Sequence, residues 1–317
     1  MMQAFGRLTL GMALAAGAAW AAPALAQDKT ILFSISKASE PFFEVMREHA
    51  EDEAGKLGVR LIFEDGKGDS VDQTADIENT IARERIDAAL IAPNDIYALA
   101  PGVNFAQAQG IPIVTVDRHV HNTVREVPRV GIDNVAGGRL LAQWVVDNFP
   151  RGAKILHLTG QPGSSTGIDR AKGVRDGLAE VKGNYQIIAE MSGNWSRAEA
   201  QMLTEGQLTV LPSPPDAIVA DNDDMAMGAL EAIRLAGRGS ASIRVVGFDG
   251  LPFALERVRD GTLAATVDQK PGAQIRTALR MVADHLRNHT PLHSATIDAV
   301  LITRDNVEAA ENASHTN

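Results

Sequence analysis

The sequence predicts an α/β fold made of two similar lobes, each built on a doubly wound parallel sheet. From Thr30 onward, short β-branched runs alternate with longer helical patterns, as expected when helices connect parallel strands. Each predicted strand is a continuous apolar run, which suits a strand covered on both faces. The alternation pauses over the polar stretch 119–129 and resumes at Asn134 without a Gly/Ser-rich or Pro-rich linker, which indicates two lobes. The predicted strands are 30–36, 60–64, 88–92, 113–116, 154–159, 186–191, 217–220, 243–248 and 264–267.

Two helices are especially clear. Between the first two predicted strands, apolar residues recur at steps of three and four from Phe43 to Leu57, and Gly58 is placed to end that helix. A second helix is predicted after Asn222, because acidic residues fill its first turn and Gly237 can terminate it. Residues 306–317 are small and polar, so we expect a frayed tail.

The N-terminus predicts export. Residues 1–7 carry one positive charge, 8–22 are apolar and small, and Ala24-Leu25-Ala26 fits the cleavage site of a secretory signal peptide spanning 1–26. A membrane anchor is the alternative, but the apolar stretch is shorter than the roughly 20 residues needed to span a bilayer. The chain has no cysteine, which excludes disulfides and the lipid-modified cysteine of a lipoprotein. We therefore expect a free periplasmic protein.

Composition and charge narrow the class of protein. The chain has 317 residues, 45% hydrophobic and only 4% aromatic, enough for a large aliphatic core in two domains. Removing 1–26 takes away one of 30 basic residues and none of the 40 acidic ones, which leaves a formal charge of −11. Such a charge repels phosphate backbones and argues against nucleic-acid binding. No later segment is apolar and long enough to embed the chain in a membrane.

Polar and aromatic residues follow many of the predicted strands. In an open α/β sheet, ligands bind outside the strand ends, so this spacing predicts one site gathered from several loops. Carboxylates, guanidinium groups and amides can bind a ring of hydroxyls, while aromatic rings cover the C–H faces between them. The candidate ligand-binding residues are Ser36, Glu40, Phe42, Phe43, Asp117, Arg118, Arg170, Trp195, Asn222, Asp249 and Gln269.

Most of these residues also have a purely structural interpretation. Phe42 and Phe43 open an amphipathic helix and can belong to the core, and Asn222 is well placed to be a helix N-cap. The pair Asp117-Arg118 can be a surface ion pair, Arg170 a solvated helix residue and Asp249 part of a turn. Trp195, a large aromatic residue in a predicted loop, calls for a functional explanation more strongly.

Several segments together resemble the ribose-type periplasmic sugar-binding proteins of ABC importers. The resemblance is collinear from Thr30 to about Thr303, and the segments that carry it are Pro41-Phe42-Phe43, Thr115-Val116-Asp117-Arg118, residues 133–138, residues 222–230 and Val245 to Gly250. It implies a ligand cleft between two lobes joined by a three-segment hinge, near 132–133, 269–270 and 298–299. The implied lobes are 27–132 with 270–298 and 133–269 with 299–305.

The resemblance also implies roles for individual residues. Ser36, Phe42 and Phe43 match the loop that holds and stacks the sugar, while Asp117 and Arg118 match the pair that grips its hydroxyls. In the second lobe Arg170, Asn222 and Asp249 match further polar contacts, Trp195 replaces a phenylalanine of ribose binders, and Gln269 lies beside a crossing between the lobes. The implied partners are a monosaccharide or polyol and an importer permease; related proteins also present sugars to chemoreceptors. No cofactor or metal is implied.

Glu40 departs from the family pattern, because ribose binders carry Asn there. An ionised glutamate accepts hydrogen bonds and donates none, so a ligand facing it must offer extra hydroxyls or an amine. Residues 133–138, 162–165 with Arg170, and 222–237 also look like the branch that binds inositols. We therefore favour a polyol or cyclitol such as myo-inositol over ribose.

Two other classes of protein share this fold. A sugar-processing enzyme is disfavoured because 160–167 fits neither phosphate-binding glycine motif, and the histidines, among them His49, His157 and the pair His119/His121, lack convincing metal spacing. We interpret these histidines as solvated or core residues. A LacI-like transcriptional regulator needs an N-terminal helix-turn-helix, where this chain has an export signal.

Overall fold

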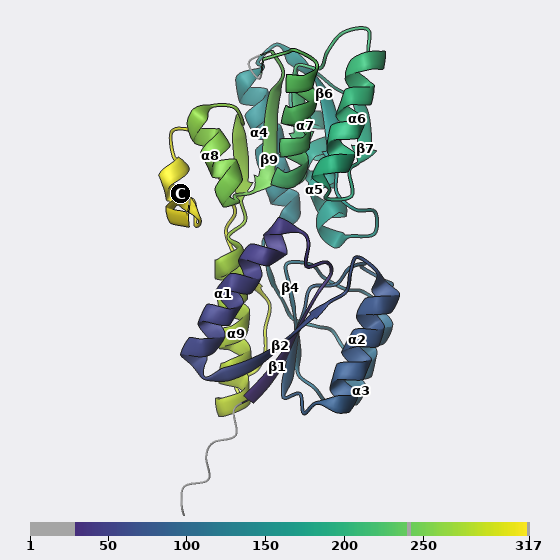
Figure 1. Cartoon of the computed structure of the whole chain (residues 1–317), viewed down its shortest axis with the longest axis vertical. Helices are drawn as coiled ribbons and strands as arrows, with labels where there is room; N and C mark the ends of the chain where they lie inside the picture. Colours follow the sequence, from purple (N-terminus) through teal and green to yellow (C-terminus); the bar gives the residue numbers. More distant parts are fainter. Residues whose placement is uncertain (1–28, 240–241, 316–317) are drawn as a thin grey trace, which may run out of the picture.

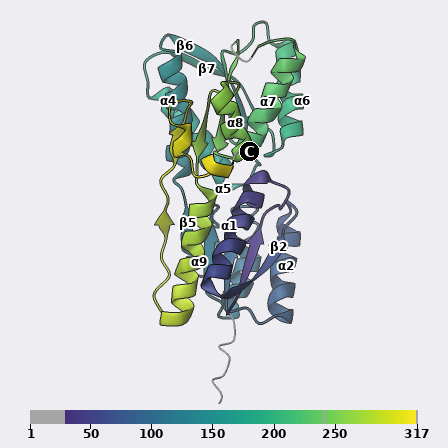
Figure 2. The ribbon, with the colours of Figure 1, turned by 60° about the vertical axis from the view of Figure 1, so that its left-hand side comes forward.

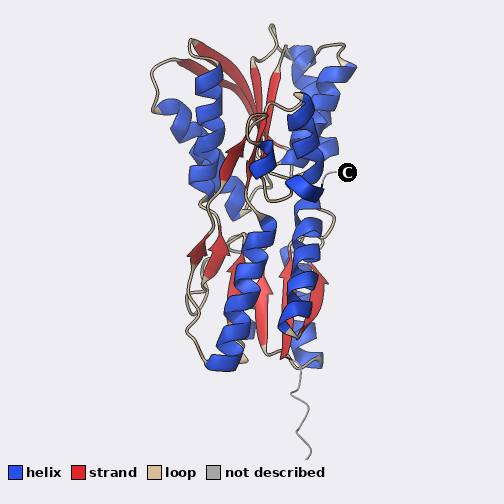
Figure 3. Ribbon diagram, turned by 90° about the vertical axis from the view of Figure 1, so that its left-hand side faces the viewer, coloured by secondary structure: helices blue, strands red, loops and turns tan. Residues whose placement is uncertain are grey.

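The computed structural model describes residues 29–239 and 242–315 and places them in two α/β lobes stacked end to end (Figure 1). The predicted signal peptide at 1–26 lies outside the described residues. Each lobe has a six-stranded sheet with helices on both faces, which Figure 3 shows as two sheets one above the other. The predicted fold class is confirmed.

The N-terminal lobe contains an all-parallel sheet in the order β11-β5-β4-β3-β1-β2. Helices α1 and α9 cover one face and α2 and α3 the other, as Figures 1 and 2 show. The elements are β1 (Lys29–Ile35), α1 (Pro41–Leu57), β2 (Val59–Asp65), α2 (Ser70–Arg83), β3 (Ala88–Ile91), α3 (Ala100–Ala108), β4 (Ile113–Val116), β5 (Arg129–Gly131), α9 (Pro271–Asn288) and β11 (Ala295–Thr296).

The C-terminal lobe repeats this plan in the order β12-β10-β9-β8-β6-β7, with only the edge strand β12 antiparallel. Helices α4 and α5 pack on one face, and α6, α7 and α8 on the other. The elements are α4 (Asn134–Asn148), β6 (Gly152–Thr159), α5 (Ser165–Ala179), β7 (Asn184–Ser192), α6 (Arg197–Val210), β8 (Ala217–Ala220), α7 (Asp223–Leu235), β9 (Arg244–Asp249), α8 (Pro252–Asp260), β10 (Ala265–Asp268) and β12 (Val300–Ile302).

All nine predicted strands are present, with ends that differ from the prediction by at most two residues. The strands β5, β11 and β12 were missed, because runs of two or three residues are too short to show a period. The two helices that the sequence predicts most clearly are α1, which ends at Gly58 with φ 62°, and α7, which begins after the N-cap Asn222.

No helix within 29–239 and 242–315 combines the length and apolarity that crossing a bilayer requires.

The chain crosses between the two sheets three times. It leaves β5 of the N-terminal sheet for α4, returns from β10 to α9, and passes from β11 to β12. The connecting residues 132–133, 269–270 and 297–299 belong to no helix or strand. Both lobes can therefore retain their own cores while the backbone at the crossings changes its dihedral angles.

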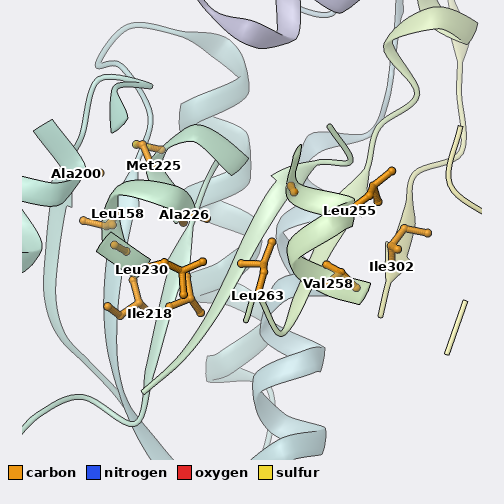
Figure 4. Packing of buried hydrophobic residues seen from close by; sticks show 14 of the residues in the cluster. Leu158, Ala200, Ile218, Met225, Ala226, Leu230, Leu255, Val258, Leu263 and Ile302 are labelled. Atoms are coloured by element: carbon orange, nitrogen blue, oxygen red, sulfur yellow. The ribbon is translucent and has the colours of Figure 1, made fainter. Parts of the chain in front are cut away.

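Each lobe has an aliphatic core on both sides of its sheet. Figure 4 shows one of these cores, where Leu158 and Ile218 of the strands meet Met225 and Leu230 of α7. These four side chains are no more than 9% exposed. Burying side chains of this size stabilises each lobe by about 1.5–3 kcal/mol apiece before the entropic cost of folding is counted.

The expectation of a frayed tail at 306–317 is wrong for the described residues. Two short 3₁₀ helices, η1 (Val307–Ala309) and η2 (Ala313–His315), fold back beside α8, where Figure 1 shows the C-terminal end. Val307 and Ala310 join the core of the C-terminal lobe, and Asn312 is 1% exposed. Apolar residues spaced along this small, polar segment are enough to dock it.

Candidate functional site

The predicted site residues lie where the strand ends of the two lobes meet. Ser36 follows β1, Asp117 follows β4, Trp195 follows β7, and Gln269 follows β10. None of the eleven candidate residues is more than 7% exposed. Polar groups are rarely buried this completely unless they are paired, so a cluster of so many buried polar side chains is unusual for a protein interior.

The lobes touch along the rim of this site. Ile96 N donates to Gly163 O at 2.9 Å, and the amide of Gln161 donates to Asn94 Oδ1 at 3.2 Å. On the other side His119 N donates to Ser165 Oγ at 3.0 Å. These hydrogen bonds join residues of different lobes, so the structure is a closed form.

Arg118 is the central polar residue of the N-terminal half. Its Nη2 donates to Glu40 Oε2 at 3.0 Å, and its guanidinium carbon lies 5.3 Å from the centre of the Phe43 ring. Glu40 is the N-cap residue of α1, but its side chain makes no cap hydrogen bond and turns to Arg118 instead. Glu40 and Phe43 thus hold Arg118 in place. Phe42 packs edge-to-face on Phe43 and belongs to the lobe's hydrophobic core.

Arg170 has the corresponding position in the C-terminal half. Its Nε donates to Asn134 Oδ1 at 2.9 Å and its Nη1 to the carbonyl of Asp221 at 2.7 Å. Asp249 Oδ1 lies 3.4 Å from the same Nη1. The guanidinium carbon sits 3.7 Å above the Phe248 ring, a cation–π geometry. Arg170 is therefore a buried, fixed donor, and the solvated-helix interpretation is wrong.

The Trp195 ring lies between the two arginines. Its centre is 5.8 Å from the guanidinium carbon of Arg118 and 5.5 Å from that of Arg170. The ring is 4% exposed. One aromatic side chain thus contacts a cation from each lobe.

The amides of Asn222 and Gln269 are mostly engaged within the protein. Asn222 Oδ1 caps α7 by accepting from Met225 N at 2.9 Å, and its Nδ2 donates to the carbonyl of Trp195 at 3.3 Å. Gln269 Nε2 donates to Asp249 Oδ1 at 2.6 Å. The N-cap interpretation of Asn222 is confirmed, and Gln269 orients the Asp249 carboxylate.

Three candidate residues have a positive φ angle, a backbone conformation that residues with a side chain rarely adopt. Asp117 has φ 63°, Trp195 has φ 62° and Asp249 has φ 122°. Positive φ in residues other than glycine is uncommon and often marks a functional site, where surrounding structure enforces it. These three residues lie at or just after the ends of β4, β7 and β9.

Buried polar atoms without a hydrogen-bond partner gather at the same place. Among residues 29–239 and 242–315, five of the six such side-chain atoms belong to candidate residues; they are Ser36 Oγ, Asp117 Oδ1, Arg118 Nε, Arg118 Nη1 and Trp195 Nε1. An unpaired buried donor or acceptor costs about 1–3 kcal/mol, so the arrangement calls for a ligand that supplies partners.

Burial shifts the pKa values of three candidate carboxylates. Burial raises the pKa of Asp117, and the charges of Arg170 and Arg118 oppose that rise. Burial likewise raises the pKa of Glu40 against Arg118, and raises the pKa of Asp249 well above its usual range against Arg170. Hydrogen bonds donated by ligand hydroxyls would favour the ionised forms.

The structure adds residues that the sequence analysis did not select. Asn94 follows β3 and binds Gln161 across the rim, while Asn134 and Asp221 hold Arg170. The strand-end rule that found Asp117 would also have found Asn94 and Asp221. No cluster of metal-ligating side chains occurs in the part of the chain that the structure describes.

Two lobes closing over a buried polar and aromatic site define a ligand-binding protein. A family described as "Periplasmic binding protein domain" matches residues 31–290, and the chain belongs to this family. The ribose import binding protein of Bacillus subtilis (strain 168) is 38% identical over 257 residues, which cover 80% of this chain and 81% of that protein. The ribose import binding protein of Escherichia coli (strain K12) is 34% identical and covers 83% and 86%. The predicted resemblance is confirmed.

Solved structures share the arrangement of both lobes. The Caulobacter myo-inositol binding protein bound to myo-inositol is 41% identical with a TM-score of 0.89, covering 92% of this chain and 98% of that one. A solute-binding protein from Bacillus halodurans with bound myo-inositol is 29% identical with a TM-score of 0.83, covering 90% and 98%.

Proposed function

We propose that this chain is a periplasmic solute-binding protein that captures a neutral polyol or monosaccharide by closing its two lobes, and delivers it to an ABC importer. The observation that carries this proposal is the group of unpaired buried polar atoms on Ser36, Asp117, Arg118 and Trp195. These atoms lie after the ends of β1, β4 and β7 and include both donors and acceptors.

The mixture of donors and acceptors restricts the chemistry of the ligand. Arg118 and Trp195 offer N–H donors, Asp117 offers a carboxylate oxygen, and Ser36 offers a hydroxyl that does both. An anion would satisfy the donors but be repelled by Glu40, Asp117 and Asp249, and a cation would leave the arginine donors unpaired. A neutral polyhydroxy compound can satisfy both kinds of group.

A cyclitol such as myo-inositol is the ligand we favour. Its ring carries hydroxyls on every carbon, and the Trp195 ring can cover its C–H face. The 41% identical Caulobacter protein was solved with myo-inositol, which supports this choice. D-Ribose is the second candidate, because several relatives are ribose import binding proteins.

Closure couples binding to transport in this proposal. Asp117 and Arg118 belong to one lobe, while Arg170, Trp195 and Asp249 belong to the other. A ligand that bridges them stabilises the closed form, and only contacts that are better in the closed form shift the equilibrium. Rotation about the three crossings at 132–133, 269–270 and 297–299 would open the site. The permease then recognises the closed protein.

Localisation follows from the sequence. We propose that 1–26 directs export and is removed near Ala26, which leaves the chain free in the periplasm. Mass spectrometry of the chain purified from periplasmic extracts tests this, and an N-terminus at Gln27 is expected.

A chemoreceptor is a further partner to test. Comparing chemotaxis with uptake after deletion of the protein would separate the two functions.

A calorimetric and thermal-shift screen tests the ligand class. The processed chain would be titrated with myo-inositol, D-ribose, D-allose and xylitol, with L-alanine and inorganic phosphate as controls. A tight ligand stabilises the folded chain by mass action, and the melting temperature rises. At a ligand concentration 100 times the Kd, the free energy of unfolding increases by about 2.7 kcal/mol. We expect the largest rise with myo-inositol. Stabilisation by phosphate or L-alanine without any effect of the polyols would overturn the proposal.

A further inference from the structure

His157 lies beneath the proposed ligand site and takes no direct part in it. It belongs to β6, between β7 and β8, and is 0% exposed. Its Nδ1 is 3.0 Å from Glu190 Oε2, and its Nε2 is 2.9 Å from Asp221 Oδ1. Both ring nitrogens therefore face carboxylate oxygens. Only an imidazolium can donate to both, because a neutral ring would direct a lone pair at one of the carboxylates.

Asp221 connects this histidine to the site. Its Oδ2 accepts from Gly160 N at 3.2 Å, and its backbone carbonyl accepts from Arg170 Nη1 at 2.7 Å. Gly160 packs directly on the Trp195 ring, where an added Cβ would lie 2.0 Å from Cη2 of the indole. One aspartate thus holds both the loop under Trp195 and the peptide that receives Arg170.

We propose that the His157 imidazolium is a positioning residue, which fixes Asp221 and through it sets the places of Trp195 and Arg170 in the ligand site. The proposal rests on the site put forward above. His157 was interpreted from sequence as a solvated or core histidine; its two carboxylate partners give it a function at a distance from the ligand.

The charged groups around His157 determine its pKa, and its proton balances a negative charge under the site. Glu190 faces it from β7, and Asp221 from the end of β8. From α5, Arg175 pairs with Glu190 Oε1 at 2.9 Å, and Arg170 binds the Asp221 carbonyl. Burial lowers the pKa of His157, but Asp221 and Glu190 outweigh burial and raise it to about 9. Deprotonation above that pH leaves the cluster with an uncompensated negative charge under the site.

The test variant is His157→Gln, which keeps a donor and an acceptor but has no charge. With myo-inositol as the probe, wild-type affinity should fall as the pH rises from 7.5 to 10. The variant should bind at least ten-fold more weakly at pH 7 and show a flatter pH profile. The exposed His293→Gln serves as the control and should match the wild type in both respects.

A double variant separates positioning from a general loss of packing. In His157→Gln/Asp221→Asn the new amide at 221 can accept from Gly160 N and donate toward position 157, which restores the connection without charge. We expect tighter binding than in His157→Gln alone, with a pH profile that stays flatter than that of the wild type. A folded His157→Gln chain with wild-type affinity and a wild-type pH profile would overturn the proposal.

A measurement on the free protein keeps this test independent of the ligand's identity. In a Trp144→Phe background of the processed chain, Trp195 is the remaining tryptophan. Its emission should change as the pH passes through about 9, and His157→Gln should remove that step. If myo-inositol fails to bind the wild type, the proposed ligand is wrong, and the emission step still decides the role of His157. Absence of the step in the parent chain would count against positioning.

Discussion

Arg118 and Glu40 form a buried ion pair, with Nη2 of the arginine 3.0 Å from Oε2 of the glutamate. The two residues are 78 positions apart and come from the loops after β4 and β1. The resemblance to ribose binders singled out Glu40 as a departure from their pattern, and this contact shows that Glu40 also holds the guanidinium of Arg118. We propose that Glu40 links the choice of ligand to the placement of this arginine.

Glu40→Gln should weaken the binding of the natural polyol. The amide can still accept from the Arg118 guanidinium, but the acceptor is then neutral and the ion pair is lost, so the arginine is held less firmly. Glu40→Asn should improve D-ribose relative to myo-inositol. Calorimetric titration of both sugars into each variant measures this. Glu44→Gln, an exposed position of the same helix, is the control. An unaltered ranking in both Glu40 variants would place Glu40 outside ligand recognition.

Arg118→Ala should nearly abolish binding while the chain remains folded. The variant removes the unpaired Nε and Nη1 donors and leaves Glu40 without its cation, a loss of about 2–5 kcal/mol. Isothermal titration gives the affinity and circular dichroism the fold. Arg60→Ala removes an exposed ion pair with Glu84 in the same lobe and should leave affinity intact. Equal affinities for the two variants would refute the site assignment.

Gly163→Ala should impair lobe closure. Gly163 has φ 84°, and a Cβ there would lie 2.0 Å from Asp95 Oδ2 of the other lobe. Asp95 cannot easily move, because its Oδ1 accepts from Tyr97 N and Ala98 N. Small-angle scattering with and without ligand would show less compaction, and affinity would fall about ten-fold or more.

Gly237→Ala is the matched control for that substitution. Gly237 has φ 69° in the same lobe, but nothing lies within 4 Å of an added Cβ. Both variants carry the cost of a left-handed alanine, about 1–2 kcal/mol of stability. Only Gly163→Ala should lose affinity, and equal affinities would show that closure tolerates the contact.

Glu311→Ala should destabilise the folded chain. Glu311 pairs with Arg276 at 2.6 Å, accepts from Gly272 N at 2.7 Å, and donates its own N–H to Asp268 Oδ2 at 2.8 Å. It thus connects the start of α9 with the end of β10. We expect a loss of about 1–3 kcal/mol in urea unfolding. Glu308→Ala, whose exposed side chain pairs with Arg259, should cost much less, because solvent screens that ion pair. Equal losses in the free energy of unfolding for the two variants would mean that the Glu311 contacts add nothing to stability.

The stability of the free protein should fall at alkaline pH through His157. Its pKa is raised from 6.5 to about 9, so the folded form holds the proton more tightly than the unfolded form. That contribution, about 3 kcal/mol, is fully present below pH 6.5 and is lost as the pH rises through about 9. Chemical unfolding between pH 6 and 10 should show the gap between wild type and His157→Gln narrowing. A constant gap would mean that His157 does not titrate in this range.

The sequence by itself determined the two-lobed α/β fold and the strand ends at which candidate ligand-binding residues lie. Apolar runs such as 113–116 are local signals, and the carboxyl ends of parallel strands meet at one edge whatever their order. Asp117, Arg118 and Asp249 could be selected for that reason.

Only the tertiary structure decided what each residue contacts. Asn222 uses its amide to cap α7, Glu40 turns to Arg118, and His157 meets Asp221, 64 positions away in the sequence. The tail that looked frayed docks because Val307 fits a core built by other segments. Such contacts depend on packing between distant parts of the chain, which no local pattern of residues records.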